Sequence, residues 1–344
     1  MSTLTPALDL PTLAGFTVRH YRGEADVPAL RDVLQADQDA DGGEGVITLA
    51  MMLNFYRHLT NCDPARDMLL VEGPAGLVAY GRVAWVKEHN APAYQYPISV
   101  LVRPEWRRQG LGRALLAWLE ARALAVAAEQ GHPRPPAGRL HWQADSSDRE
   151  LARTAVLERA GYTPVRYFYE MVRPDLENIR DVNLPAGLEV RPVTPEHYPA
   201  IWDANVEAFR DHWGETERTA DDYARWLSDE REFQPAIWKV AWDTATNEVA
   251  GMVLGYIIAE QNQKFNRLRG WTENICVRRP WRKRGVASAL IAENLRELKA
   301  RGMTEAALGV DTENPTGALR VYEAMGFRPV QRGAAYRKPF PSDL

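Results

Sequence analysis

The sequence has few cysteines, no long hydrophobic run and no excess of positive charge. Its 344 residues include only Cys62 and Cys276, which excludes a disulfide framework and indicates a reducing compartment. The longest apolar candidate, 115–128, is broken by Glu120 and Arg122, so we expect no membrane span. Lys and Arg total 42 against 46 Asp and Glu, a net charge of −4, which disfavours general binding to nucleic acid. We therefore expect a cytoplasmic protein, a monomer or homodimer, that binds neither nucleic acid nor membrane.

Several familiar ligand-binding motifs are also missing. The seven histidines are scattered, with no His-Glu-x-x-His and no Cys-x-x-Cys, so we expect no bound metal. A P-loop is excluded because no Gly-Lys-Ser/Thr occurs. Gly110-x-Gly112 is not a dinucleotide fingerprint, because residue 115, where the third glycine would stand, is Leu115.

The chain contains one sequence pattern twice. The offsets between matching segments are 172 (190 − 18), 175 (281 − 106) and 165 (326 − 161), in the same order along the chain. Three similar offsets in one order indicate a tandem duplication. The matches pair 18–19 with 190–191, 105–116 with 280–291, and 158–165 with 323–330.

Each copy has the same expected order of strands and helices. Strands alternate with helices, which predicts layered α/β units. We expect an N-terminal domain over 16–173, a C-terminal domain over 188–340 and a polar linker between them. The expected strands are 16–19, 68–71, 77–86, one ending at Val102, and 140–144 in the first copy, and 188–191, 237–242, 249–258, one ending at Val277, and 306–310 in the second.

A strand, a glycine turn and a helix follow one another at the same place in both copies. The second copy reads Arg282-x-x-Gly285-x-Ala287, and its counterpart is 107–112. Such a turn directs unpaired backbone N–H groups to one spot at the positive end of a helix, which suits a pyrophosphate. We expect glycine there because a Cβ would intrude on the anion. The alternative is that the glycines only turn the chain and the arginines are solvated.

The second copy continues with a further pattern, Asn-x-x-x-Ala-x-x-x-Tyr-x-x-x-Gly-Phe. Together with the paired glycine turns, this pattern resembles the GNAT superfamily of acetyl-CoA-dependent N-acetyltransferases. The resemblance covers about 16–340, and the arrangement is similar to two-copy bacterial members. It implies two tandem GNAT folds, each a splayed mixed β-sheet flanked by helices. The residues that carry the late pattern are Asn314, Ala318, Tyr322, Gly326 and Phe327.

The resemblance also implies acetyl-CoA as cosubstrate, with its pantetheine arm lying beside the strand that ends at Val277. Backbone N–H groups of 284–288 would hold the pyrophosphate, Asn314 would meet the pantetheine arm and Tyr322 would point at the sulfur. The residues expected at the cofactor are Ile275, Val277, Arg282, Lys283, Arg284, Gly285, Val286, Ala287, Ser288 and Asn314, with Val102, Arg107, Arg108, Gln109, Gly110, Leu111, Gly112 and Arg113 in the first copy.

Acetyl transfer to an amine requires that the amine lose a proton and that the leaving thiolate gain one. Glu273 lies four residues before Val277, and side chains on a strand repeat every two residues, so we expect Glu273, Ile275 and Val277 to face one side. We predict Glu273 as the base and Tyr322, one helical turn before Gly326, as the acid. An ion-paired strand carboxylate and a core tyrosine are the alternatives.

The first copy has lost these side chains. Subtracting the local offsets (273 − 175, 322 − 165 and 314 − 165) places Ile98, Leu157 and Arg149 at the positions of Glu273, Tyr322 and Asn314. We therefore expect the C-terminal domain to be catalytic and the N-terminal domain to be degenerate and structural. Whether the N-terminal domain still binds acetyl-CoA is open.

The acceptor is expected to be an amine of a small molecule or a peptide. Asp211 could pair with that amine, and Trp213 could wall the pocket or hold a cation against its ring; solvated loop charge and core packing are the alternatives. In some two-copy relatives an acidic residue stands earlier on the strand, where this chain has Trp271, so the substrate stays undefined.

Two other functions are compatible with the sequence. The basic run 278–284 contains an aromatic residue and by itself would suit nucleic acid. Its place before a phosphate-binding helix, in an acidic chain, favours CoA phosphates. A non-catalytic CoA-binding sensor or scaffold is the second class, and the pair of Glu273 and Tyr322 argues against it.

Overall fold

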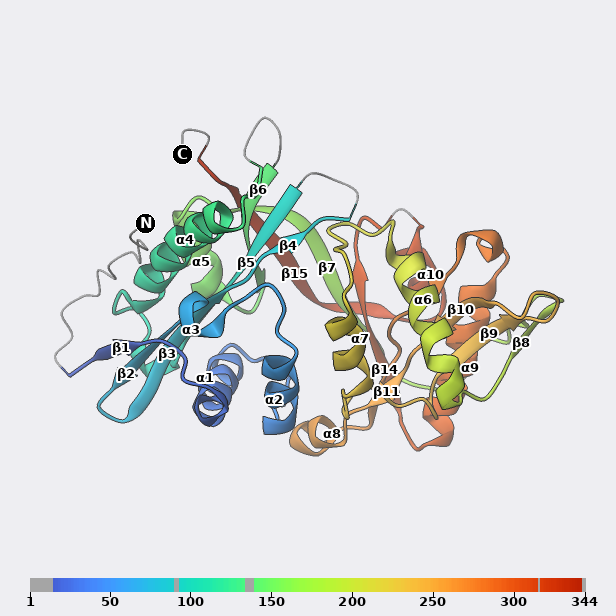
Figure 1. Ribbon diagram of the computed structural model, residues 1–344. Helices are drawn as coiled ribbons and strands as arrows, with labels where there is room; N and C mark the ends of the chain where they lie inside the picture. Colours follow the sequence, from blue (N-terminus) through green and yellow to red (C-terminus); the bar gives the residue numbers. More distant parts are fainter. Residues whose placement is uncertain (1–14, 90–92, 134–138, 315, 342–344) are drawn as a thin grey trace. The chain divides into compact units, whose positions relative to one another are not determined.

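The chain forms two compact units, which are described here one at a time (Figure 1). Unit 1 contains Met1–Val165 and Ala334–Leu344, and unit 2 contains Arg166–Gly333. The computed structural model describes residues 15–89, 93–133, 139–314 and 316–341.

Unit 1 is built on a mixed sheet in the order β1-β2-β3-β5-β6, with the short β4 paired to β5. Neighbouring strands are antiparallel except β5 and β6, which are parallel. The final part of β15 (Arg328–Pro339) lies next to β6, and just after it the Phe340 N–H donates to Leu140 O at 3.0 Å. The strands are β1 (Thr17–Arg19), β2 (Met68–Gly73), β3 (Gly76–Val83), β4 (Val86–Lys87), β5 (Ala93–Val102), β6 (Arg139–Ser147) and the start of β7 (Thr163–Arg173).

Helices α1 and α4 cover opposite faces of this sheet. Adjacent side chains on a strand point to opposite faces: Tyr80 packs in the cluster under α1, whereas Gly81 faces Leu119 of α4. The helices of unit 1 are α1 (Val27–Ala40), α2 (Leu49–Arg57), α3 (Pro64–Asp67), α4 (Leu111–Glu129) and α5 (Leu151–Arg159), with 3₁₀ turns at Glu24–Asp26 and Pro104–Trp106.

Unit 2 divides its strands between two groups. One is a four-stranded antiparallel sheet, β13-β10-β9-β8, and the other follows the order β7-β14-β12-β11. Within the second group β12 and β14 are parallel. The strands are β8 (Leu188–Val190), β9 (Lys239–Asp243), β10 (Val249–Val253), β11 (Tyr256–Ile257), β12 (Arg269–Trp271), β13 (Cys276–Val277), β14 (Glu305–Asp311) and β15 (Arg328–Pro339). A mixed sheet flanked by helices is thus confirmed.

Two of the expected strands in the second copy are interrupted. The segment expected as 249–258 forms β10 and β11, and the strand expected to end at Val277 forms β12 and β13. β11 and β12 pair with each other in one group, while β10 and β13 pair in the other. The corresponding strands of unit 1, β3 and β5, are continuous. The interruption therefore separates the two strand groups of unit 2.

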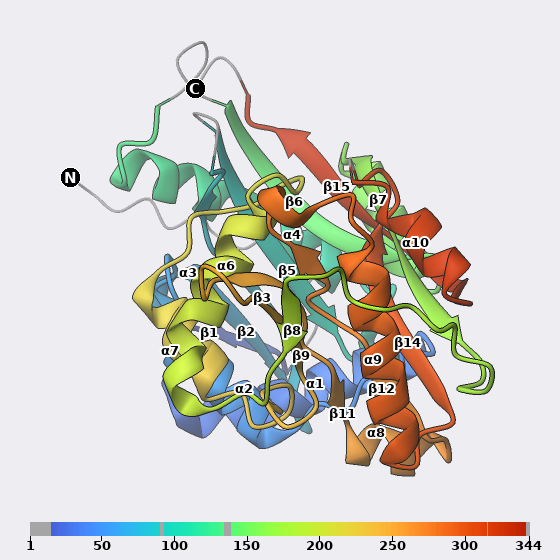
Figure 2. The same cartoon turned by 90° about the vertical axis from the view of Figure 1, so that its right-hand side faces the viewer.

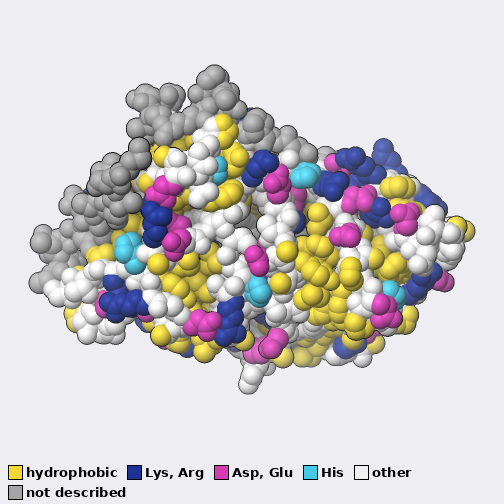
Figure 3. Space-filling model, viewed as in Figure 1, with side chains coloured by type: hydrophobic (Ala, Val, Ile, Leu, Met, Phe, Trp, Pro, Cys, Tyr) yellow, Lys and Arg dark blue, Asp and Glu magenta, His cyan; other side chains and the backbone are white. Residues whose placement is uncertain are grey.

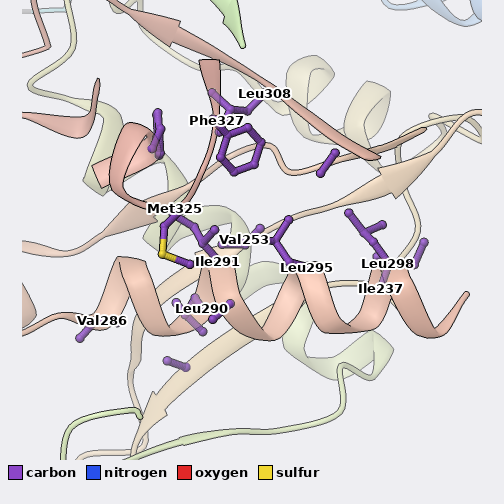
Figure 4. Packing of buried hydrophobic residues seen from close by; sticks show 14 of the residues in the cluster. Ile237, Val253, Val286, Leu290, Ile291, Leu295, Leu298, Leu308, Met325 and Phe327 are labelled. Atoms are coloured by element: carbon purple, nitrogen blue, oxygen red, sulfur yellow. The ribbon is translucent and has the colours of Figure 1, made fainter. Parts of the chain in front are cut away.

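The core of unit 2 lies against helix α9 (Val286–Ala300). Figure 4 shows its apolar side chains packed among those of neighbouring strands, and α9, labelled in Figure 2, packs against β9, β10 and β13. Helix α6 covers the other face, because Val240 packs beneath α6 whereas Ala241 packs beneath α9. The remaining helices are α6 (Tyr198–Phe209), α7 (Ala220–Leu227), α8 (Ala259–Phe265) and α10 (Ala318–Ala324), with 3₁₀ turns at Pro195–His197 and Arg279–Trp281.

The units do not follow the boundaries of the sequence repeats. Residues 166–173 belong to the first repeat, yet they pair with β14 in unit 2 from Phe168 to Arg173. Residues 334–340 belong to the second repeat, yet they lie in unit 1, where Lys338 Nζ donates to Glu120 at 2.9 Å. The expected linker packs on unit 2, because Leu176 is buried in its core.

The described helices include none that is both long and apolar enough to cross a membrane.

Leu290, on α9, provides a test of this core because it is fully buried. We expect Leu290→Ala to lower the free energy of unfolding by about 3 kcal/mol, since it removes buried methyl groups and leaves a cavity. Leu268→Ala, at a residue that is 48% exposed, is the control and should change it by under about 0.5 kcal/mol. Urea denaturation measures both, and equal losses would contradict the assigned core.

Candidate active site

The site begins where β13 and β14 separate. β14 pairs with β12 as far as Trp271, and the Thr272 N–H donates to Ala307 O at 2.8 Å. β13 is the edge of the four-stranded sheet. The Arg278 N–H donates to Ala250 O on β10, so the N–H and C=O of the preceding residue, Val277, point away from β10. Backbone groups at such an edge can bind an extended ligand as an added strand.

The interruption between β12 and β13 is centred on Asn274. This residue has a φ of 47°, in the left-handed region, and the Leu254 N–H donates to Glu273 O at 2.9 Å. Side-chain alternation does not continue through such a residue, so the predicted common face of Glu273, Ile275 and Val277 does not hold. Ile275 and Val277 pack against the core under α9.

Glu273 lies where β13 and β14 separate, at the junction of the two strand groups, which we call the fork. Its carboxylate accepts a hydrogen bond of 2.7 Å from the Gly309 N–H on β14. Burial raises the pKa of Glu273 from an ordinary value of 4.5 to about 8; the Gly309 bond opposes this shift, and the negative charges of Glu232 and Glu170 add to it. Glu273 is therefore a stronger base than an ordinary surface carboxylate.

Tyr322, on α10, is buried within the same unit and is 6% exposed. Burial raises its pKa well above the ordinary value of 10, and negative charge on Glu273 and Cys276 raises it further. Its ring lies 6.5 Å from that of Phe327, measured between centroids. The structure thus brings Tyr322 and Glu273, the two predicted catalytic residues, within electrostatic reach of each other.

The glycine turn leads from β13 into α9. Lys283 has a φ of 59° and Gly285 a φ of 84°, so left-handed residues alternate just before the first helical residue, Val286. This alternation forms a concave backbone surface whose N–H groups are suited to binding an anion. The turn in unit 1 has the same form, with Arg108 at 61° and Gly110 at 88°. A Cβ on Gly285 would meet no protein atom within 4 Å, so within the protein itself glycine is favoured there by its positive φ.

The guanidinium of Arg282 binds groups of the protein itself. Its Nε donates to Val277 O at 2.9 Å, and its other nitrogens bind Asp211 Oδ2 at 3.0 Å and Ala208 O at 3.2 Å. It therefore joins the end of β13 to the end of α6, and the structure gives no support for its predicted contact with the cofactor. Arg107 is held in the same way in unit 1, by Val102 O, Asp37 and Asp41.

Asp211 is also bound within the protein. Both of its oxygens pair with arginines, because Arg279 forms a second ion pair beside that of Arg282. These hydrogen bonds lower the pKa of Asp211 to about 2. With its charge already neutralised, Asp211 has no support as the predicted partner of an amine. Trp213 is half-buried, with the Arg166 guanidinium 5.9 Å from its ring centroid.

Asn314 fixes the loop that precedes α10. Its side-chain oxygen accepts hydrogen bonds from Thr316 N–H at 2.8 Å and Thr316 Oγ1 at 2.6 Å. Among the remaining predicted cofactor residues, Lys283, Arg284 and Gly285 are exposed, Ala287 and Ser288 are half-buried, and Val286 is buried. In unit 1, Val102 and Leu111 are buried, while Gln109, Gly112 and Arg113 lie at the turn and the first residues of α4.

Basic side chains gather on unit 2 over the segment that leads into α9 (Figure 3). Arg279, Lys283 and Arg284 are exposed there. Exposed cations around an anion-binding turn suit a ligand with several phosphates.

Three residues that the sequence did not mark as part of a site lie near Glu273. Tyr256 stacks on Trp271 with 6.1 Å between ring centroids, and Trp271 Nε1 donates to Gln261 Oε1 at 3.0 Å. Glu232, which follows α7, influences the pKa of both Glu273 and Tyr256. In the sequence Trp271 is marked only as a departure from related proteins, and no motif marks Tyr256 or Glu232. The described residues hold no cluster of three or more His, Cys, Asp or Glu that could bind a metal.

The site thus consists of an edge strand, a second strand that diverges from it and a turn suited to anions. This combination suits an extended ligand that carries phosphate at one end. The model of the acetyltransferase (GNAT) family matches residues 46–136 and 198–327. The chain belongs to this family, and it is an N-acetyltransferase with two GNAT copies.

Curated relatives extend over most of the chain. It is 31% identical to a mycothiol acetyltransferase of Streptomyces bingchenggensis, over 80% of this chain and 82% of that protein. It is 28% identical to a mycothiol acetyltransferase of Salinispora arenicola, over 88% and 91%.

Solved structures show the same tandem fold. A GCN5-related N-acetyltransferase from Sphaerobacter thermophilus aligns with a TM-score of 0.66 and 28% identity over 96% of both chains. A tandem GNAT protein from the clavulanic acid biosynthesis pathway aligns with a TM-score of 0.64 and 17% identity, over 94% of this chain and 98% of that chain. The predicted tandem GNAT fold is confirmed.

Glu273 should make the stability of the protein depend on pH. Because its pKa is raised in the folded state, the stability that Glu273 itself contributes is fully present below about pH 4.5 and is lost as the pH rises through 8. Glu273→Gln keeps an oxygen that can accept the Gly309 hydrogen bond but cannot ionise. We expect the free energy of unfolding of Glu273→Gln, relative to that of the wild type, to increase by on the order of 3 kcal/mol between pH 5 and pH 9. Glu293→Gln, on the exposed face of α9, is the control, and parallel pH profiles for Glu273→Gln and wild type would refute the raised pKa.

Gly285 and Gly302 form a matched pair at the two ends of α9. Both have a φ of 84°, and a Cβ on either would meet no atom within 4 Å. Alanine at each should lower stability by about 1 kcal/mol. Only Gly285→Ala should weaken acetyl-CoA binding, by about tenfold or more, because it redirects the N–H groups of the turn. Titration calorimetry measures both affinities, and equal affinities would show that the turn does not hold the ligand.

Proposed function

We propose that unit 2 transfers an acetyl group from acetyl-CoA to the amine of a small molecule, with Glu273 as the base and Tyr322 as the acid. The observation that carries this proposal is the position of Glu273. Its carboxylate, with a pKa raised to about 8, lies where β13 and β14 separate and within electrostatic reach of the Tyr322 hydroxyl.

The residues present fit acetyl-CoA. The turn of 283–288 offers backbone N–H groups and exposed cations to phosphates, and the outward backbone of Val277 offers an edge to the pantetheine arm. Asn314 lies in the loop that follows β14, the strand that diverges from this edge. When bound, acetyl-CoA supplies an acetyl group activated as a thioester.

The surroundings of Glu273 favour a positively charged acceptor. Negative charges on Glu232 and Glu170 are close enough to raise the pKa of Glu273, and they would equally stabilise an ammonium group. Tyr256 and Trp271 stack beside them and provide aromatic surface for the rest of a small molecule. The name of the curated relatives, mycothiol acetyltransferase, supports an acceptor of small-molecule size.

The two catalytic groups have the proton affinities that their proposed roles require. A carboxylate whose pKa is near 8 can accept a proton from an ammonium group more readily than an ordinary carboxylate can. Tyr322 keeps its proton at neutral pH because its pKa is raised, so its hydroxyl can supply a proton to a leaving thiolate. Unit 1 has Ile98 and Leu157 at the corresponding positions and no equivalent chemistry.

Kinetics of two conservative variants test the assignment. We expect Glu273→Gln and Tyr322→Phe each to lower kcat by ~10²–10⁴, the usual size of a general acid–base contribution. Wild-type kcat/KM should fall below about pH 8 as Glu273 becomes protonated, and this decline should disappear in Glu273→Gln. Thiol release from acetyl-CoA, measured across amines, polyamines, amino acids, aminoglycosides and peptides, provides the assay.

Glu293→Gln is the control for this experiment and should keep wild-type kinetics. Unchanged kcat in both active-site variants would place the chemistry elsewhere. Binding of acetyl-CoA without thiol release for any amine would instead favour a sensor or scaffold.

A further inference from the structure

Unit 1 contains the same fork as unit 2. β5 pairs with β6 from Ala93 to Pro97, and no described strand pairs with its second half on that side. The Arg103 N–H donates to Val78 O at 2.9 Å, which directs the N–H and C=O of Val102 away from β3. The anion-binding turn is also present. The backbone of unit 1 therefore retains both parts of a cofactor site.

A side chain of unit 1 already occupies this edge. The Val102 N–H donates to Asp37 Oδ1 at 3.4 Å, and Asp37 is only 6% exposed. The same carboxylate accepts hydrogen bonds from Arg107 at 2.9 Å and from Arg153 at 2.7 Å. Asp37 thus makes the backbone contact that an extended ligand would need, and two arginines neutralise its charge.

The ion pair of Asp37 and Arg153 joins the two sides of the fork. Asp37 lies on α1, which covers β3 and β5, whereas Arg153 lies on α5, which follows β6. A second connection lies beside it, because Arg149 donates to Gly42 O at 2.7 Å. Arg149 stands where unit 2 has Asn314.

Both members of this ion pair are alanines in unit 2. Arg282 of unit 2 donates to Ala208 O, as Arg107 of unit 1 donates to Asp37 O, so Ala208 occupies the position of Asp37. Arg153 corresponds to Ala318 at the local offset (318 − 153 = 165). A methyl group cannot accept a hydrogen bond from the strand or form an ion pair across the fork.

We propose that unit 1 is closed to acetyl-CoA by the Asp37–Arg153 ion pair, which fills the place of the pantetheine arm, so that each chain binds one acetyl-CoA, in unit 2. This inference rests on the proposed function. It excludes the first-copy residues 107–113 from the cofactor site even though their turn has the required backbone. Unit 1 is then a structural domain in which its own side chains make the contacts that a bound acetyl-CoA would otherwise make.

Calorimetry and hydrogen exchange on the full-length protein test this proposal directly. We expect 1.0 acetyl-CoA per chain, with slower amide exchange on binding at 284–288 and Val277, and no change at Val102 or 108–112. Two sites per chain, or protection of the turn in unit 1, would overturn it. No binding at all would instead refute the proposed function.

A double variant tests the ion pair itself. Asp37→Ala with Arg153→Ala installs the residues found in unit 2 and leaves Arg107 paired with Asp41, so no buried charge loses its only partner. We expect this variant to bind two acetyl-CoA molecules per chain and to gain protection at Val102. The control is Arg31→Ala with Asp32→Ala, an adjacent ion pair on α1, which should keep one site.

The variants also define how the inference would fail. A folded double variant that still binds one acetyl-CoA would refute the role of the ion pair, and two sites in the control would refute its specificity. Circular dichroism establishes that the variants are folded. If the double variant does not fold, the wild-type stoichiometry and exchange pattern still decide the proposal.

Discussion

The hydrogen bond from Gly309 N–H to the Glu273 carboxylate is the contact on which the site in unit 2 depends. It lies at the last point where the two strand groups are joined, and beyond it β13 and β14 separate. The same hydrogen bond holds the proposed base at the point where β13 and β14 begin to separate. The separation of these strands, which would make room for a ligand, therefore also positions the carboxylate of Glu273. Burial at this point shifts the proton affinity of Glu273 towards that of an amine.

A repeated arginine keeps each edge strand in position. Arg282 and Arg107 each bind the last carbonyl of the edge strand and groups at the end of the first long helix of their unit. A guanidinium suits this role because its donors form a fixed planar fork. The arginine of the family motif therefore has a structural role in both copies. The groups still available to a ligand are the backbone N–H groups of the turn that follows it. The copies differ in what lies beside this arginine, an acidic side chain in one and a methyl group in the other.

The sequence predicted the order of elements and the position of the glycine turns well, because both depend on local patterns. It did not predict the interruption at Asn274, since the alternation of side chains was assumed to run through to Val277. It also misjudged Asp211, whose partners Arg279 and Arg282 lie 68 and 71 residues later. Pairings over such distances leave no trace in spacing or periodicity. The neighbourhood of Glu273, with Tyr256 and Glu232, arises from the same kind of distant contact, whereas Glu273 and Tyr322 could be found because each stands beside a recognisable segment.

The last strand of each sequence repeat contributes residues to the other unit, and this has a consequence for biosynthesis. Unit 1 includes Phe340, whose ring lies 4.4 Å from that of Trp142 and 4.8 Å from that of Tyr96, measured between centroids. A ribosome that has made residues 1–165 of unit 1 must still translate the whole of unit 2 before this ring becomes available. The half of the protein that is synthesised first is therefore the half that is completed last, and neither repeat, cut at its sequence boundary, carries all the strands of one unit.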